Sequence, residues 1–218
     1  MQFSRRHFVG AAIAATAGAS STGRAFAEPE NLLPRPYAVP AEARQVDQPP
    51  LLAEALAALD RHSAYVFDRS RIGLVDFGVP SREPRFHLVD VAGGRIERSW
   101  LVAHGNGSDP SATGMLQRFS NEPGSNASSQ GAYVTSTTYY GKHGISQRMI
   151  GLDTTNDMAL DRAIVIHGAS YVDPSLIASQ GRIGRSQGCF AVEPGEIAAV
   201  MAALGEGRMI YAGRPAWA

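Results

Sequence analysis

The chain has 218 residues, of which 20 are basic and 20 acidic, and its formal net charge is zero. This balance gives no electrostatic case for nucleic acid or for an anionic membrane surface as a partner. Only one cysteine, Cys189, is present, so a disulfide framework within the chain is excluded and the residue needs another explanation.

The first 27 residues have the layout of an export signal. Arg5 and Arg6 form a twin arginine, residues 9–19 are mostly apolar, and a small-x-small site ends at Ala27. This order predicts a Tat-type signal peptide that is cleaved after Ala27, and therefore a protein of the periplasm. The apolar run is shorter than the roughly 20 residues of a transmembrane helix, so we expect no stable membrane insertion after cleavage. Cleavage leaves 17 basic residues against 20 acidic ones, which again does not favour nucleic acid.

The rest of the chain divides into a tether and one domain. Prolines and charges dominate residues 28–50, which we expect to form an extended tether. The remaining residues, 51–218, are enough for one hydrophobic core and too few for two. We therefore predict a single domain over residues 51–218.

The spacing of the apolar residues predicts two helices and a series of short strands. Residues 51–61 have apolar positions at helical spacing, and residues 194–204 begin with a proline in the first helical turn. Glycines at 93 and 94 predict a hairpin between the second and third strands. The strands are expected at residues 71–78, 85–91, 95–103, 132–138, 147–152, 163–167, 188–192 and 207–212.

A long polar segment separates the third and fourth strands. Residues 104–130 are rich in glycine, serine, asparagine, aspartate and proline. A loop of this length within a compact domain is more often functional than accidental, so it is a candidate wall of a substrate cleft. Many short strands and few helices predict a mainly β fold, a sandwich or partly open barrel with a few peripheral α-helices.

Two short segments could carry chemistry together. An apolar strand ends in His167 and Gly168, and Ser186-Gln187-Gly188-Cys189 follows about 20 residues later. A histidine held at the end of a buried strand can take the proton of a thiol, and the thiolate can then attack a carbonyl. Backbone amides beside a glycine can hold the oxyanion that forms. This pairing favours acyl transfer, although a lone cysteine or histidine is more often a buried core group.

Several motifs in order resemble those of the murein L,D-transpeptidase catalytic domains, which have a YkuD-type fold. Besides I-H-G and S-x-G-C, the segments that carry the resemblance are His104 to Ser108, Phe119 to Asn121, Tyr139 to Gly144 and Arg162 to Gly168. The resemblance covers about residues 60 to 213. It implies an L,D-transpeptidase-like fold and an enzyme that acts on peptidoglycan stem peptides without a metal or organic cofactor.

The same resemblance implies roles for individual residues. Cys189 would be the nucleophile and His167 the general base. The nucleophile loop, whose amides would form the oxyanion hole, would consist of Ser186, Gln187 and Gly188. The thiol would attack the carbonyl of the L-centre of diaminopimelate, expel the terminal D-alanine, and pass the acyl group to an amine.

Four further residues are candidates for substrate binding. Gly168 lies beside the expected base, and Arg185 lies beside the nucleophile loop, where a guanidinium could bind a carboxylate. Lys142 and His143 lie in a glycine-flanked loop that could line the cleft or be a solvated turn. His104 and Asp109 could be taken for metal ligands, but no third ligand stands at a suitable spacing, so no metal site is expected.

Two positions depart from the pattern of the best-known family members. Gln187 stands where they have histidine, and Ala191 stands where they have a polar residue. These departures leave the substrate and the acyl acceptor open, more than they affect the nucleophile. The alternatives to a transpeptidase are an L,D-carboxypeptidase that uses water as acceptor and a non-catalytic domain that binds the cell wall.

Overall fold

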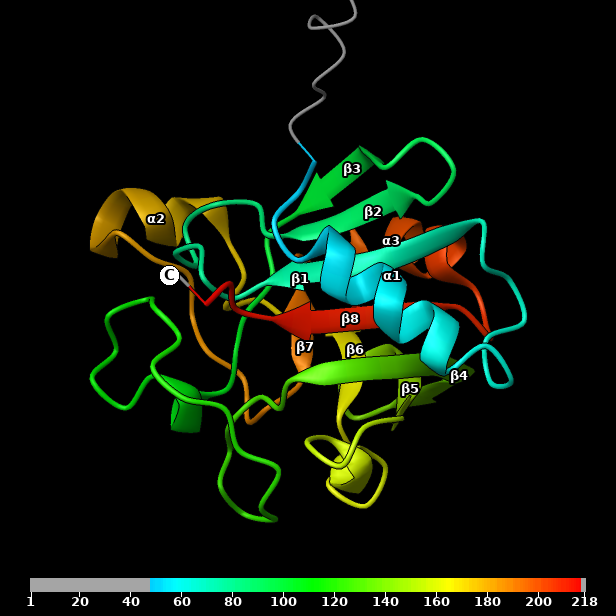
Figure 1. The fold of residues 1–218 in the computed structure, drawn as a ribbon. Helices are drawn as coiled ribbons and strands as arrows, with labels where there is room; N and C mark the ends of the chain where they lie inside the picture. Colours follow the sequence, from blue (N-terminus) through cyan, green and yellow to red (C-terminus); the bar gives the residue numbers. More distant parts are fainter. Residues whose placement is uncertain (1–47, 217–218) are drawn as a thin grey trace, which may run out of the picture. The chain divides into compact units, whose positions relative to one another are not determined.

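The computed structural model describes residues 48–216, whose central feature is one sheet of eight strands (Figure 1). The predicted signal peptide, residues 1–27, and most of the predicted tether lie outside the described residues. The strands are β1 (Arg71–Asp76), β2 (Phe86–Asp90), β3 (Arg95–Trp100), β4 (Gly131–Gly141), β5 (Gly144–Gly151), β6 (Val165–Gly168), β7 (Phe190–Val192) and β8 (Met209–Gly213).

The sheet is mixed, with the order β3-β2-β1-β8-β4-β5-β6-β7. β1 pairs in parallel with β8, β6 pairs in parallel with β7, and the other neighbours are antiparallel. The predicted hairpin is confirmed, because β2 and β3 pair antiparallel around Gly94, whose φ of 61° suits glycine. The mainly β fold with few helices is likewise confirmed.

The sheet does not close into a barrel, although its two ends approach each other. The segment after β3 reaches the other edge strand, where the Ala103 amide donates to the Ala191 carbonyl in β7 at 2.8 Å. Two residues further on, Gly105 forms a bridge with Ser186. A partly open barrel is therefore the better of the two expected descriptions, and the place where its edges approach is the nucleophile loop.

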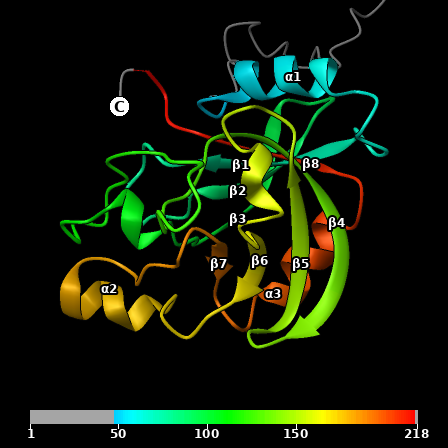
Figure 2. The same ribbon diagram turned by 90° about the horizontal axis from the view of Figure 1, so that it is seen from below.

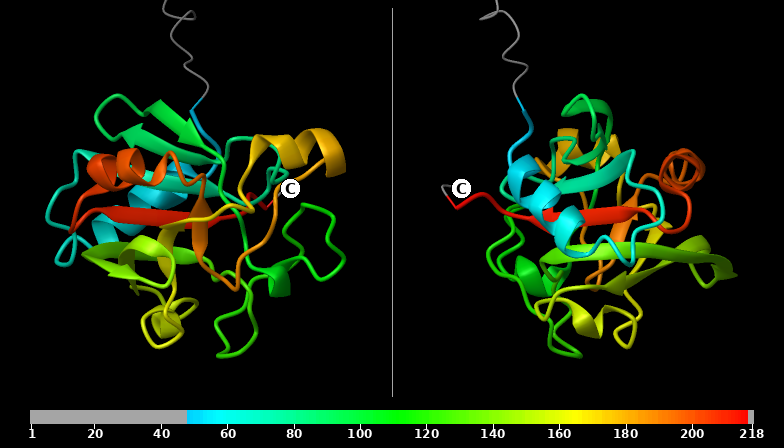
Figure 3. Two further views of the ribbon diagram at one scale, coloured as in Figure 1. Left: turned by 180° about the vertical axis from the view of Figure 1, so that it is seen from behind. Right: turned by 45° about the vertical axis from the view of Figure 1, so that its right-hand side comes forward.

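Helices cover both faces of the middle of the sheet (Figure 3). Helix α1 (Leu52–Arg61) packs its apolar side on one face, against Ile72, Leu74 and Met209. Helix α3 (Ile197–Leu204) packs on the other face, against Val75 and Ile210 and their neighbours. Because β1 and β8 are covered on both sides, their residues are buried almost without interruption, as in strands of doubly covered sheets.

One helix was not predicted from the sequence. Helix α2 (Pro174–Gln180) has Asp173 as its N-cap, whose carboxylate accepts from the Ser175 amide at 2.8 Å. Proline occupies the first turn, and Gly181 ends the helix with a φ of 73°. These start and stop residues are readable in the sequence, but α2 has seven residues and none of them is fully buried, so it is too short to show the repeat of apolar positions that predicts a helix.

A fully buried arginine fixes the start of the long loop to the sheet. Arg85 donates to the Val102 carbonyl through Nε and Nη2 at 3.1 and 2.9 Å, and to the Val79 carbonyl at 2.8 Å. Its Nη2 also lies 2.7 Å from Nδ1 of His104. Burial lowers the pKa of Arg85 to about 9, and burial together with the Arg85 charge lowers the pKa of His104 to about 3. At neutral pH a charged Arg85 therefore donates to a neutral His104.

Replacing Arg85 with methionine should lower the free energy of unfolding by about 3–5 kcal/mol, because buried carbonyl groups and a ring nitrogen lose their donor. Urea unfolding followed by circular dichroism would measure this loss. Arg95→Met is the matched control, since its side chain is 68% exposed and should change stability by less than about 0.5 kcal/mol. Equal midpoints for the two variants would contradict the prediction.

Candidate active site

The nucleophile loop is a tight turn tied by one serine. Ser186 is buried, its hydroxyl donates to the Cys189 carbonyl at 2.7 Å, and it accepts from the Gly188 amide at 3.1 Å. Gly188 has a φ of 110°, a conformation that L side chains rarely adopt. The turn delivers Cys189 to the start of β7 with its side chain partly exposed.

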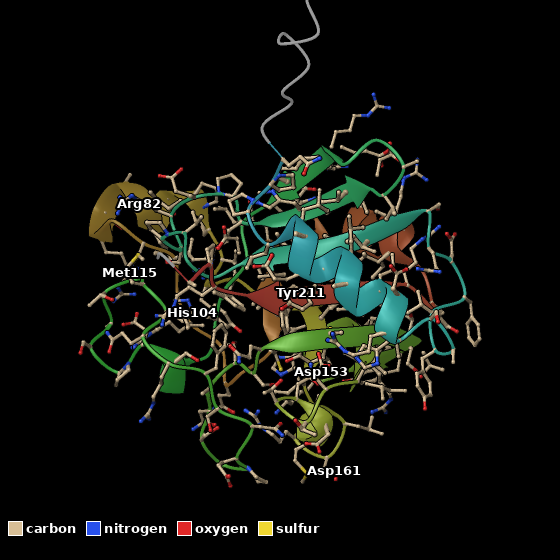
Figure 4. The ribbon with its side chains drawn as sticks, in the orientation of Figure 1. Arg82, His104, Met115, Asp153, Asp161 and Tyr211 are labelled. Carbon is tan, nitrogen blue, oxygen red and sulfur yellow. The ribbon has the colours of Figure 1, made fainter. Side chains whose placement is uncertain are left out.

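The first residues of the long loop clamp this turn in place. The Ser186 amide donates to the His104 carbonyl at 2.9 Å, and the Asn106 amide donates to the Ser186 carbonyl at 2.8 Å. A Cβ on Gly105 would lie 2.2 Å from the Asn126 carbonyl oxygen and 2.8 Å from the Gly188 nitrogen, so only glycine fits. His104, labelled in Figure 4, thus belongs to a structural clamp of the nucleophile loop.

The candidate base is held by β6. His167 pairs with Ser146 of β5 and Ala191 of β7, and only 2% of its surface is exposed. Its Nδ1 lies 3.0 Å from the Gly168 carbonyl oxygen, which can only accept. We therefore assign the proton of the neutral ring to Nδ1, which leaves Nε2 as the base.

Strand pairing places the cysteine and the histidine on one face of the sheet. His167 lies opposite Ala191, and Cys189 precedes Ala191 by two residues, so side-chain alternation directs both toward the same side. Both line a cavity of about 780 Å³. Within the described residues, the hydrogen-bond partner of the Cys189 sulfur is the Ala163 carbonyl oxygen at 3.7 Å, and the thiol is not yet hydrogen-bonded to His167.

Both groups rest in their neutral forms. Burial raises the pKa of the Cys189 thiol above its ordinary value. The backbone amide of Val165 and the charges of Lys142 and Arg162 lower this pKa, but their effect is smaller than that of burial. Burial also lowers the pKa of His167, and the nearby His143 and Lys142 lower it further. The hydrogen bond with the Gly168 carbonyl raises this pKa, but by less than burial lowers it. The resting pair is therefore a thiol and an imidazole, as general-base activation of the thiol requires.

The structure brings three of the four predicted binding residues into this cavity. Lys142, His143 and Arg185 line it, and Arg185 also donates to the Asp109 carbonyl. Gly168 instead lies against Pro194 and Ile197, where an added Cβ would be 3.2 Å from the Cα of Pro194. Gly168 therefore supports the base through its carbonyl and is not part of the cavity wall.

Arg162 and Ala163, just before β6, were not assigned a role from the sequence. Arg162 lies in the cavity wall and donates to the Ser120 and Ala127 carbonyls, which holds the long loop against the site. Ala163 has a φ of 53°, unusual for a residue other than glycine, and its carbonyl is the resting partner of the thiol. The R-x-x-x-x-H-G segment contains both residues, but no sequence signal reveals that the Ala163 backbone adopts a positive φ and that its carbonyl contacts the thiol.

The long loop forms part of the wall, as its composition predicted. Its contribution comes from Asn106, Pro123, Gly124 and Asn126, and Tyr139, Asp161, Val165 and Tyr171 also line the cavity. Asp161, labelled in Figure 4, follows the short helix η3 (Asp157–Ala159) on the way to β6. The cavity is lined by three basic side chains, Lys142, Arg162 and Arg185, and by one carboxylate, Asp161. This excess of positive charge makes it suited to an anionic ligand.

A family model described as "L,D-transpeptidase catalytic domain" matches residues 43–212. The chain belongs to this family. The predicted resemblance is thereby confirmed, and the match covers nearly all of the described part of this L,D-transpeptidase domain. A search of curated proteins gave no significant match.

Three solved structures similar to this L,D-transpeptidase domain are distant in sequence. One is an L,D-transpeptidase from Mycobacterium tuberculosis H37Rv, with 12% identity, a TM-score of 0.41, and coverage of 66% of this chain and 58% of that one. Another is the helical cell shape determining protein Pgp2 from Campylobacter jejuni, with 14% identity, a TM-score of 0.43, and coverage of 69% and 49%. An L,D-transpeptidase from Xylanimonas cellulosilytica has 18% identity, a TM-score of 0.37, and coverage of 73% and 69%. The chain thus spans less than two thirds of the length of the first two, and its assignment rests on the family model.

The two departures from the family pattern have different surroundings in this L,D-transpeptidase domain. Gln187 is exposed and lines the cavity, where its amide can meet a substrate. Ala191 is fully buried in an apolar cluster with Leu101, Ala103 and Ile183, so a substrate cannot reach it. Gln187 is therefore the departure that bears on the substrate.

Residues 48–216 of the L,D-transpeptidase domain include no helix long and apolar enough to cross a membrane. In the same described residues, no group of three or more histidine, cysteine or carboxylate side chains is arranged to hold a metal ion.

Proposed function

We propose that this protein is a periplasmic cysteine acyltransferase that acts on peptidoglycan stem peptides. The observation that carries the proposal is that Cys189 and His167, whose Nδ1 is engaged by the Gly168 carbonyl, line one cationic cavity. The family supports a peptidoglycan substrate. The twin arginine of residues 1–27 supports export, and recovery from the periplasm of a protein that begins at Glu28 would test it.

The first half of the reaction forms a thioester. Nε2 of His167 takes the thiol proton of Cys189, and the sulfur attacks the carbonyl carbon of the L-centre of diaminopimelate. The Gly188 amide already donates to Ser186, so the Gln187 and Cys189 amides are our candidates for holding the oxyanion. The imidazolium then gives its proton to the departing amine, the C–N bond breaks, and D-alanine leaves.

The second half returns the enzyme to its resting state. An acceptor amine attacks the thioester carbon and loses a proton to Nε2 of His167. The C–S bond breaks, the new amide is released, and the imidazolium returns the proton to the thiolate. Lys142 and Arg185 line the cavity, and in the proposed reaction their charges hold the carboxylates of the stem peptide.

Intact-mass spectrometry of the protein during incubation with tetrapeptide muropeptides tests the proposal. We expect an adduct of the acyl fragment on Cys189, free D-alanine, and crosslinked dimers as the product. If tripeptide is the only product, the acyl acceptor is water and not an amine, and the protein is an L,D-carboxypeptidase. Binding to sacculi with neither adduct nor D-alanine release would reject catalysis in favour of a cell-wall-binding domain.

Replacing Gly188 with alanine should lower kcat/KM by about 100-fold, because a displaced sulfur loses its alignment with base and substrate. The new Cβ would lie 2.8 Å from the Ala127 carbonyl oxygen and 2.9 Å from Cδ1 of Ile164, at a φ of 110°. Gly195→Ala is the matched control, since nothing lies within 4 Å of its added Cβ. D-alanine release measures both variants, and equal rates would contradict the role of the turn.

A further inference from the structure

A second histidine ring covers the candidate base. His143 stacks on His167 with ring centroids 4.2 Å apart and an interplanar angle of 25°. His143 is exposed, whereas His167 is almost fully buried. Both rings line the same cavity, so the His143 ring separates one face of the base from the solvent in the cavity.

The hairpin that carries His143 is well fixed. β4 and β5 remain paired to their ends, where Gly141 lies opposite Gly144, so Lys142 and His143 form a two-residue turn. Next to the turn, the Arg148 guanidinium of β5 lies over the Tyr139 ring of β4, 4.4 Å from the ring centroid. Figure 2 shows this hairpin curving along one side of the domain with β6 beside it. The stack is therefore built on paired strands and not on a free loop.

We propose that His143 is a positioning residue of the general base, whose ring holds the His167 imidazole in place and keeps water from its face. This inference rests on the proposed function of His167. It gives His143 a role other than the substrate contact expected from the sequence. A stacked ring restricts rotation of His167, which keeps Nδ1 on the Gly168 carbonyl and leaves Nε2 free to act as the base.

The charges around His167 give the stack a second effect. Lys142 and His143, in the hairpin turn, both lower the pKa of His167 electrostatically. The other titratable or charged groups that line the same cavity are Arg162, Arg185, Asp161, Tyr139, Tyr171 and Cys189. Burial is the main cause that lowers the pKa of His167, and His143 adds to it. Removing the ring exposes the base to water and removes a like charge, so the pKa of His167 should rise toward its ordinary value.

Three variants separate the covering ring from other roles. His143→Ala removes the ring, His143→Phe keeps a flat ring without the charge, and Tyr140→Ala is a control on the same hairpin, where Tyr140 is 87% exposed. NMR titration of the His167 ring in a Cys189→Ala background requires no substrate. We expect the pKa of His167 to rise in His143→Ala, to rise less in His143→Phe, and to stay unchanged in Tyr140→Ala.

Turnover provides the second measurement. In an otherwise wild-type background, His143→Ala should lower kcat by about 10-fold with little change in KM, and His143→Phe should recover most of the loss. An unchanged titration of His167 in His143→Ala, a loss confined to KM, or equal defects in the two His143 variants would each overturn the proposal. If the wild type shows no turnover, the proposed function fails, while the titration still decides whether His143 covers His167.

Discussion

Cys189→Ala is expected to reduce D-alanine release from tetrapeptide substrates to the background rate, a loss of about 10⁴-fold or more. The sulfur is the only atom in the cavity that the proposed mechanism joins covalently to the substrate, and alanine offers no replacement. The variant should fold normally, because the side chain is partly exposed and its one hydrogen-bond contact to the Ala163 carbonyl oxygen is long, at 3.7 Å. Chromatography of the released amino acid measures the effect.

Two comparisons make the Cys189 result specific. Cys189→Ser keeps a hydroxyl beside His167 and should be nearly as inactive, because a hydroxyl ionises far less readily than a thiol. Circular dichroism and binding to peptidoglycan sacculi should match the wild type in both variants. If Cys189→Ala releases D-alanine at the wild-type rate, the proposed chemistry is wrong.

His167→Gln is expected to lower kcat/KM by about 10²–10⁴-fold, the usual contribution of a positioned general base. Glutamine approximates the size of the ring and can still donate to the Gly168 carbonyl, but it cannot take the thiol proton. The matched control is His87→Gln on β2, whose histidine bonds the Ser99 hydroxyl and does not line the cavity. A His167→Gln enzyme with wild-type kcat/KM would remove His167 from the mechanism.

The pH dependence of the wild type follows from the same pair. The reactive form holds a neutral imidazole and a protonated thiol, so activity falls below the pKa of His167 and changes again above that of Cys189. Burial lowers the first pKa and raises the second. The plateau of kcat/KM should therefore extend from below about pH 6.5 to above about pH 8.5, the ordinary values of the two groups. His167→Gln should lose the acidic limb.

The strands could be located from the sequence because each one is a short run with apolar residues, separated from the next run by polar or glycine-containing segments. The expected strand at residues 132–138 was too short, since β4 continues through Tyr139 and Tyr140 to Gly141. None of these last residues is fully buried, so no burial pattern indicates them. The sequence interpretation therefore treated His143 as part of a flexible loop and missed its stack on His167.

The cysteine and the histidine could be chosen by their chemistry, but their arrangement could not be derived. Their separation along the chain does not reveal that β6 and β7 pair in parallel, and that pairing puts both side chains on one face. The resting contact of the thiol with Ala163 depends on one backbone angle, which no residue preference indicates. Long-range pairing and single backbone conformations are set by the complete fold, so local patterns contain little information about them.

The bond between the Ala103 amide and the Ala191 carbonyl has a consequence for how the chain matures. The two segments that it joins are far apart in sequence, and such distant pairings form only after a large entropic cost of chain closure has been met. A nascent or partly folded chain therefore carries an ordinary cysteine. Under the proposed function, reactivity toward acyl donors is therefore a property of the finished fold, in which Cys189 and His167 line one cavity.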